Sequence, residues 1–144
     1  MAGKGRILIV DDEEDITFFL KKALENYGFE ITAFNDPIQA LDNFNAGSYD
    51  LVLLDIKMPK MDGFELYQKL KEIDGKAKVC FMTAFEVYAD ALKELFPDFY
   101  SELCFIKKPF SVPDFVKKIS KEMAEHMGVH DNTGAPSNNY YNIK

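Results

Sequence analysis

Carboxylates follow directly on two apolar runs of the chain. Asp11 and Asp12 come after the run 7–10, and Asp55 ends the run that begins at Leu51. Four aliphatic residues in a row predict a strand buried on both faces of a parallel sheet, and such sheets bind ligands at the carboxyl ends of their strands. If the two strands are neighbours, their carboxylates converge and repel one another unless a cation or proton intervenes. Oxygen ligands with no His or Cys nearby favour Mg²⁺.

Two further predicted strands end in a hydroxyl and in ammonium groups. The strand at 78–82 leads into Thr83, and the strand at 103–106 leads into Lys107 and Lys108. Each residue alone has an ordinary explanation, as a helix cap or as a solvated charge. Those explanations do not account for the shared position of all these groups at successive strand ends. The pattern predicts one site with a nucleophilic carboxylate, a metal, a hydroxyl and a cation.

In these motifs the chain resembles the response-regulator receiver domains of two-component signalling, over residues 4–127. The motifs are the pair Asp11 and Asp12, Asp55 with MPKMDG from Met58 onward, the pair Thr83 and Ala84, and Lys108 with Pro109 and Phe110. The resemblance implies that Asp55 accepts a phosphoryl group from a phosphohistidine, on a sensor histidine kinase or in a phosphorelay on a phosphotransfer protein. It implies Mg²⁺ as the cofactor, held by Asp11, Asp12, Asp55 and the Lys57 carbonyl. It also implies that Thr83, the Ala84 N–H and Lys108 bind the phosphoryl oxygens.

The same resemblance implies a switch and a site mouth. Thr83 and Phe105 are the expected switch pair, in which the aromatic ring moves between a buried and an exposed position. Phe105 has no hydroxyl, so only packing can hold its rotamer. Lys57 and Glu86 are expected to flank the mouth of the site and to adjust the access of water. The output is expected to be an unidentified protein partner or a phosphorylation-dependent dimer, contacted through a face that borders Phe96, Phe99 and Tyr100. The alternative is that these rings fold back over the longer loop as a satellite core.

Length and composition limit the organisation of the chain. Its 144 residues, 47% hydrophobic, predict one receiver domain at 1–128 and a disordered polar tail at 129–144. A net charge of −7 argues against a nucleic-acid partner. No apolar run is long enough for a signal peptide or a membrane span, so we expect a cytoplasmic protein that does not contact a membrane. Cys80 and Cys104 lie within apolar runs, and we expect both to be free thiols.

Strands alternate with helices along the chain, which predicts an α/β fold. The expected architecture is a flavodoxin-like, doubly wound sheet of five parallel strands in the order 2-1-3-4-5, with five helices; this strand order is taken from the known fold. The helices are expected at residues 16–27, from Pro37 to near Gly47, at 63–73, at 88–96 and from the Ser111 cap to 127. The segment 96–103 departs from the family pattern.

Three functions are compatible with these residues. The favoured function is a stand-alone phosphorylation switch, which is no enzyme beyond its own phosphorylation and dephosphorylation. An aspartyl-phosphate phosphatase on a related fold is the alternative, but Asp55 does not open a D-x-D motif. A nucleotide or flavin binder is a third possibility, and the chain has neither of the glycine-rich phosphate-binding motifs.

Overall fold

The computed structural model describes residues 4–83, 94, 104–108 and 111–126. Its elements, in chain order, are β1 (Gly5–Val10), α1 (Glu14–Asn26), β2 (Phe29–Phe34), α2 (Pro37–Asp42), β3 (Leu51–Asp55), α3 (Gly63–Ile73), β4 (Val79–Thr83), β5 (Cys104–Lys107) and α6 (Val112–His126). Three predicted features lie outside the described residues: the helix at 88–96, the segment 96–103 and the tail at 129–144.

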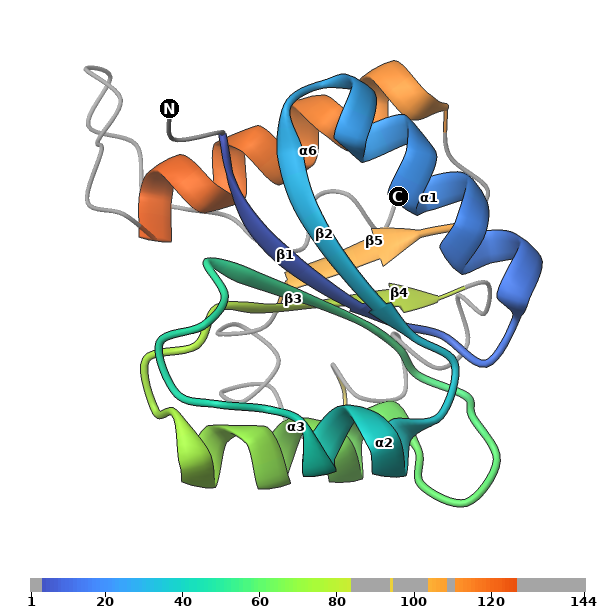
Figure 1. The fold of residues 1–144 in the computed structure, drawn as a ribbon, viewed down its shortest axis with the longest axis vertical. Coiled ribbons are helices and arrows are strands. Elements are labelled where there is room, and N and C mark those ends of the chain that lie inside the picture. Colours follow the sequence, from blue (N-terminus) through green and yellow to red (C-terminus); the bar gives the residue numbers. More distant parts are fainter. Residues whose placement is uncertain (1–3, 84–93, 95–103, 109–110, 127–144) are drawn as a thin grey trace. The chain divides into compact units, whose positions relative to one another are not determined.

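The five strands form one sheet in the order β2-β1-β3-β4-β5, which confirms the predicted topology (Figure 1). Strand β1 pairs in parallel with β2 and with β3, and β4 pairs in parallel with β5. The pairing of β1 with β3 runs from Ile7 opposite Leu51 to Val10 opposite Leu54. Both strands are buried over these residues, as their continuous aliphatic runs predict. The sheet therefore brings the first and third strands of the chain side by side, with their carboxyl ends together.

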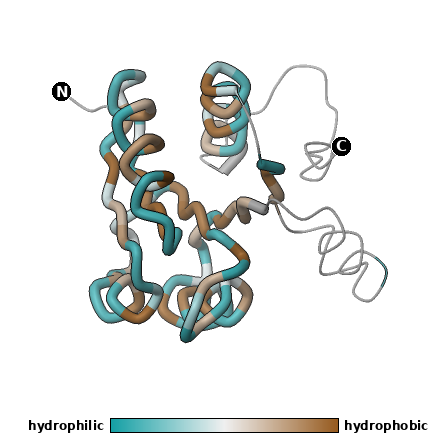
Figure 2. The backbone as a smooth tube through the Cα atoms, turned by 90° about the vertical axis from the view of Figure 1, so that its right-hand side faces the viewer, coloured by the Kyte–Doolittle hydropathy of each residue, from teal (hydrophilic) through white to brown (hydrophobic). Residues whose placement is uncertain are grey.

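The chain divides into two compact units, Met1–Val79 and Cys80–Lys144. In the first unit α1 lies on one face of β1, β2 and β3, while α2 and α3 lie side by side on the other face (Figure 1). Figure 2 shows hydrophobic strands and helices that alternate between hydrophobic and hydrophilic residues. The helices thus bury one stripe each against the strands, which is the amphipathic pattern expected of a surface helix.

Local signals set the helix ends of the first unit. Helix α1 ends at a C-cap at Tyr27, and Gly28 follows with φ +97°, a conformation that favours glycine. Asp36 caps α2 through an N–H donated by Ile38, as predicted. The structure corrects the other end of α2, which stops at Asp42 and not near Gly47. Asn43 is its C-cap, and a turn precedes the glycine, whose φ is +77°.

In the second unit β4 and β5 pair in parallel, and Ser111 accepts a hydrogen bond from Asp114 N–H at the start of α6, as its capping motif predicts. The prediction of free thiols is wrong, because Cys80 and Cys104 form a disulfide. The register places the two residues directly opposite one another, with their Cα atoms 4.5 Å apart, within the usual range for a disulfide.

None of the helices among the described residues combines the length and the apolar character needed to cross a membrane.

Candidate functional site

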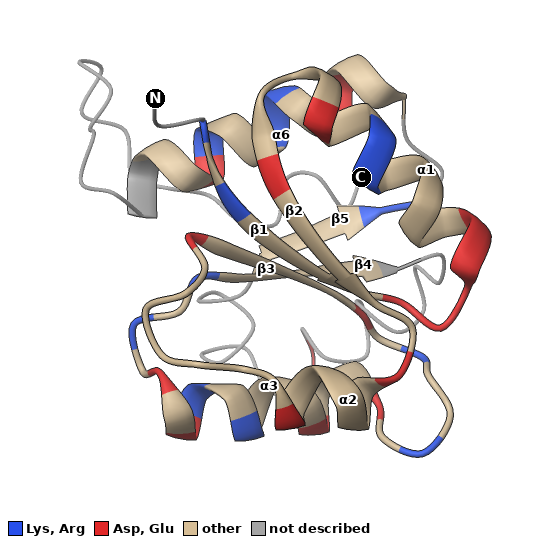
Figure 3. Ribbon diagram, in the orientation of Figure 1, with Lys and Arg blue, Asp and Glu red and all other residues tan. Residues whose placement is uncertain are grey.

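Three carboxylates converge where β1 and β3 end. Asp11 follows β1, Asp55 is the last residue of β3, and the two strands are hydrogen-bonded neighbours. A carboxylate oxygen from each of Asp11, Asp12 and Asp55 lies within 4.8 Å of the others. Asp11 is fully buried and Asp55 is 8% exposed. Figure 3 shows the acidic residues that connect β1 to α1. The structure therefore brings together the three acids that the sequence predicted as neighbours.

These residues fit a magnesium ion. Buried carboxylates at this separation repel one another strongly, and a divalent cation removes the repulsion. All three ligand groups supply oxygen, which Mg²⁺ prefers. Asp12 is partly exposed, so water can complete the coordination that Mg²⁺ usually keeps. The side chains of Asp11, Asp12 and Asp55 would hold the ion, whereas Lys57, whose carbonyl was also predicted as a ligand, has an exposed side chain.

Asn35 fixes the loop that carries Asp11. Its side-chain amide donates to the Asp11 carbonyl and to the Thr17 hydroxyl, both at 2.8 Å. Glu13 N–H donates to the Asp11 carboxylate at 3.0 Å, which further fixes the orientation of this side chain. The sequence analysis missed Asn35. The available signal was its position directly after the strand at 29–34, at the same carboxyl edge as the acids.

The other side of the site depends on a close backbone contact at Gly63. Its N–H donates to the Ile56 carbonyl at 2.7 Å, so the first residue of α3 lies against the chain that leaves β3. A Cβ atom at Gly63 would lie 2.9 Å from Ile56 Cα and would overlap the Asp55 carbonyl oxygen. Glycine is therefore required here for lack of space, whereas the sequence analysis identified it only as the start of a helix.

The loop between Asp55 and Gly63 is anchored by its apolar residues. Met58 is 8% exposed and Met61 is 7% exposed, while Lys57 and Lys60 point to solvent. Lys60 has φ +72°, which is uncommon for a residue with a side chain. This alternation of buried and exposed residues holds the main chain after Asp55 in one path.

A surface cleft of about 540 Å³ lies beside the acidic cluster, and Asp12 forms part of its wall. Lys60 and Asp36 also line it and form an ion pair at 3.1 Å. The Ile38 N–H, and after it Lys60, hold the pKa of the Asp36 carboxyl below its usual value. The cleft has room for a group larger than a metal ion next to Asp12.

The remaining predicted residues belong to the second unit. Thr83 is the last residue of β4 and pairs with Lys107 of β5, and the half-buried Lys108 follows β5. Phe105 is fully buried and stacks on Phe81, with ring centroids 5.5 Å apart. Ala84, Glu86, Pro109 and the aromatic residues of 96–103 lie outside the described residues.

Residues 7–120 match the family described as response regulator receiver domain. The chain belongs to this family. The receiver is 37% identical over 118 residues to the response regulator receiver protein CpdR of Brucella abortus, covering 81% of this chain and 94% of that protein. It is 34% identical to the chemotaxis protein CheY of Bacillus subtilis, covering 82% of this chain and 97% of CheY. It spans about half the length of some related transcriptional regulators.

A solved structure supports the same assignment. The response regulator TrrA of Thermotoga maritima superimposes with a TM-score of 0.68 at 32% identity, over 81% of this chain and 97% of that one. That protein was crystallised in complex with Mg²⁺-BeF. The receiver thus shares its fold with a relative that binds a metal together with a fluoroberyllate group.

Proposed function

We propose that this receiver is a phosphorylation switch in which Asp55 is the phosphoacceptor. The observation that carries the proposal is the convergence of three carboxylates, two of them buried, on the ends of adjacent parallel strands. A stable fold gains nothing from this repulsion, and buried charges without compensation are costly. A site that takes up a cation and a phosphoryl group uses the same arrangement.

The chemistry is the transfer of one phosphoryl group. A carboxylate oxygen of Asp55 attacks the phosphorus of a phosphohistidine, an O–P bond forms, and the P–N bond breaks, so that the histidine leaves. When bound, Mg²⁺ would supply positive charge to the carboxylates and to the phosphoryl oxygens. Asn35 and Gly63 position the two strand ends through their contacts to Asp11 and to the chain after Asp55.

Residues of the second unit complete the proposed switch. Thr83 and Lys108, which end β4 and follow β5, would bind the phosphoryl oxygens, together with the Ala84 N–H. Phosphoryl binding would change how the Phe105 ring packs against Phe81. Lys57 and Glu86 would set the lifetime of the phosphoryl group at the mouth of the site.

The partners of this switch are proteins. The phosphodonor would be a sensor histidine kinase or a phosphotransfer protein, and the output a protein partner or a second copy of the chain, in the cytoplasm. Phe18 and Phe19 support a protein docking surface, since their side chains on α1 are 66% and 53% exposed. That helix begins directly after the acidic residues of the site. We propose no enzymatic turnover of an external substrate.

The test is incubation with Mg²⁺ and acetyl phosphate, followed by intact mass. The wild-type receiver should gain one phosphoryl group, and Asp55→Asn should gain none. Asp42→Asn is the matched control, because it removes an exposed carboxylate at the end of α2 and should leave the gain unchanged. Uptake by Asp55→Asn, or undiminished uptake by the wild type in excess chelator, would refute the proposal.

A further inference from the structure

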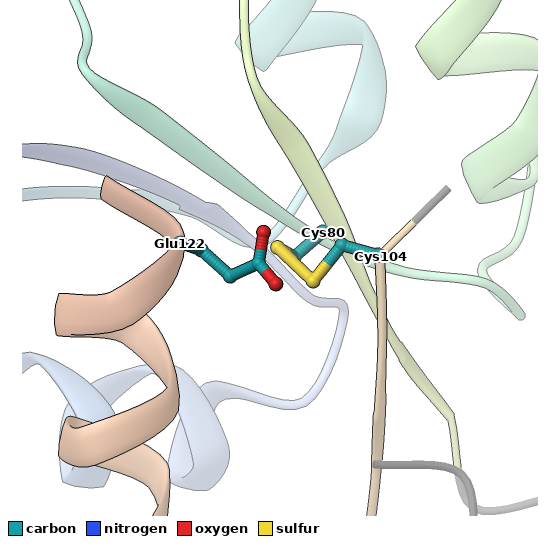
Figure 4. Close-up of side chains that lie close together, drawn as sticks. All are labelled: Cys80, Cys104 and Glu122. Atoms are coloured by element: carbon teal, nitrogen blue, oxygen red, sulfur yellow. A yellow bond between two sulfur atoms is a disulfide. The ribbon is translucent and has the colours of Figure 1, made fainter. Parts of the chain in front are cut away.

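The disulfide of the second unit lies in the core and beside an ion pair. Cys80 and Cys104 are fully buried, as is Glu122 of α6 at 1% exposure. Figure 4 shows the Glu122 carboxylate pointing at the two sulfur atoms, and an oxygen of this group lies within 4.8 Å of both. Lys118, one turn earlier on α6, pairs with the same carboxylate, and its side chain is 6% exposed. These groups are enclosed together.

We propose that Cys80 and Cys104 are a reversible redox site, the substrate of a dithiol reductant, whose oxidation state sets how the receiver responds to phosphorylation. The bond itself stands on the strand register and the Cα separation, its reversibility rests on the proposed compartment, and its effect on the response rests on the proposed function. In the cytoplasm, the compartment proposed for this receiver, disulfides that form are transient. The two residues face one another across paired strands and can form this bond without any rearrangement of the backbone.

The reaction balances as a thiol–disulfide exchange. A thiolate of the dithiol attacks one sulfur, the Cys80–Cys104 bond breaks, and a mixed disulfide with the other cysteine as a thiol is left. The second thiol of the reductant then attacks the reductant's own sulfur in the mixed disulfide, which breaks that bond and releases the remaining cysteine as a thiol. Two electrons and two protons pass to the receiver, which becomes a dithiol, while the reductant becomes a disulfide. Exchange requires local opening of α6, because the sulfurs are buried.

The two redox states differ in how freely β4 and β5 can move. In the oxidised state the sulfurs are held about 2 Å apart, whereas two unbonded sulfurs separate by roughly a further 1.5 Å. The register then carries this change along both strands, with Phe81 opposite Phe105 and Thr83 opposite Lys107. Side chains alternate between faces, so Phe105 lies on the face away from the disulfide. Cys104 is thus one residue before Phe105, the proposed switch residue, and Cys80 is three residues before Thr83.

The oxidised state should therefore resist the movement that phosphorylation drives. The crosslink joins the two strands that carry Thr83 and Phe105, and any shift of one strand along the other would require the disulfide to move with it. The reduced state keeps the same hydrogen-bonded ladder without that constraint. Reduction releases the switch, and oxidation holds it in one position.

The experiment compares the wild-type receiver in its two redox states. The protein is equilibrated overnight in mixtures of reduced and oxidised dithiothreitol, and the thiols are counted by alkylation and intact mass. Only two cysteines occur in the chain, so the reagent has no other sulfur to modify by exchange. We expect a reversible transition of both thiols together, and a melting temperature lower by roughly 5–10 °C in the reduced form.

The second readout is the change in tyrosine fluorescence or in near-ultraviolet circular dichroism on adding acetyl phosphate with Mg²⁺. We expect phosphate uptake at Asp55 in both redox states, and a spectral change about fivefold or more larger in the reduced form. The double variant Cys80→Ala/Cys104→Ala should behave like the reduced wild type whichever buffer is used. The comparison of the two wild-type states needs no variant, so it holds even if this variant does not fold.

Three outcomes overturn the proposal. In the native protein the two cysteines could stay oxidised, or stay reduced, at every ratio of reduced to oxidised dithiothreitol, which would exclude a reversible site. The spectral changes could be equal in both states although Asp55 is phosphorylated, which would exclude control of the switch. Stoichiometric zinc uptake by the reduced protein, lost in Cys80→Ala/Cys104→Ala, would make the group a metal site. Absence of phosphorylation in both states would instead refute the proposed function and leave the redox titration to decide the redox site.

Discussion

Gly63→Ala is the substitution that most directly tests how the site is positioned. The added Cβ would lie 2.9 Å from Ile56 Cα and 3.1 Å from the Asp55 carbonyl carbon, and closer still to the Asp55 oxygen. Carbon atoms that are not bonded prefer about 3.5–4.0 Å, so the chain after Asp55 must move by about half an ångström or more. All three neighbours are backbone atoms, and none can escape by changing a rotamer.

The cost follows from two opposing terms. Overpacking of this kind destabilises by about 1–3 kcal/mol, and alanine in place of glycine in a helix returns at most about 1 kcal/mol. The net loss is at most about 3 kcal/mol with a midpoint of about 1.5 kcal/mol, and at this midpoint the melting temperature of a chain of this length falls by roughly 3–6 °C. Because the displaced atoms belong to Asp55 and its neighbour, the rate of phosphorylation by acetyl phosphate should fall by about tenfold or more.

Gly75→Ala is the matched control. Its nearest neighbour outside the adjacent residues is the Lys71 carbonyl at 3.8 Å, and its φ is not positive. This variant should melt within about 0.5 kcal/mol of the wild type, as surface substitutions usually do, and be phosphorylated at the same rate. Thermal melts and intact-mass time courses on the three proteins decide the matter. If Gly63→Ala matches Gly75→Ala in both measurements, the contact with Asp55 is not a constraint.

Three further substitutions test separate parts of the site. Asn35→Ala removes two partly buried hydrogen bonds and should cost about 1–3 kcal/mol in urea unfolding and slow phosphorylation, whereas Asn43→Ala removes one exposed bond and should do neither. Lys108→Ala should still accept phosphate but lose the spectral response, whereas Lys107→Ala should keep it, because neighbouring residues on a strand point to opposite faces. If Lys107→Ala loses the response and Lys108→Ala keeps it, the two lysines have been assigned to the wrong faces. Asp36 has a lower pKa in the folded state than in the unfolded state, where its pKa is near 4. Its ionised form therefore stabilises the fold fully above about pH 4, and this contribution is lost as the pH falls further. Asp36→Asn should lower the melting temperature at pH 7 and no longer do so near pH 2.

The sheet and the acidic cluster could be predicted because both follow from one-dimensional patterns. Two aliphatic runs that end in acids predict buried parallel strands, and the structure pairs those strands with Val10 opposite Leu54. The carboxylates then meet because parallel strands end at the same edge. The order of the strands came from the known fold, since hydrophobic pattern alone does not state which strands are neighbours.

The disulfide could not be predicted, because it depends on register. Cys104 begins β5, and Cys80 is the second residue of β4. A slip of one residue in the pairing would move each side chain of one strand to the other face and leave the sulfurs apart. The run of apolar residues is compatible with either register. Gly63 and Asn35 were missed for a related reason, since their roles are contacts with residues that are distant in the chain or across a loop.

Phe105 shows how magnitudes restrict the proposed switch. The ring is fully buried and stacks on Phe81, so its exposure would cost about 1.5–3 kcal/mol of burial and about 0.5–1.5 kcal/mol of stacking. Coupling between two sites is typically about 1–3 kcal/mol, which meets only the lower part of this cost. A tyrosine in this position could recover part of it through a hydrogen bond in the exposed state, whereas phenylalanine cannot. Where the coupling is smaller than the cost, we expect the ring to stay buried with or without phosphate, and phosphorylation would then act by shifting the strands that hold the ring, which is the movement that the proposed Cys80–Cys104 switch would restrain.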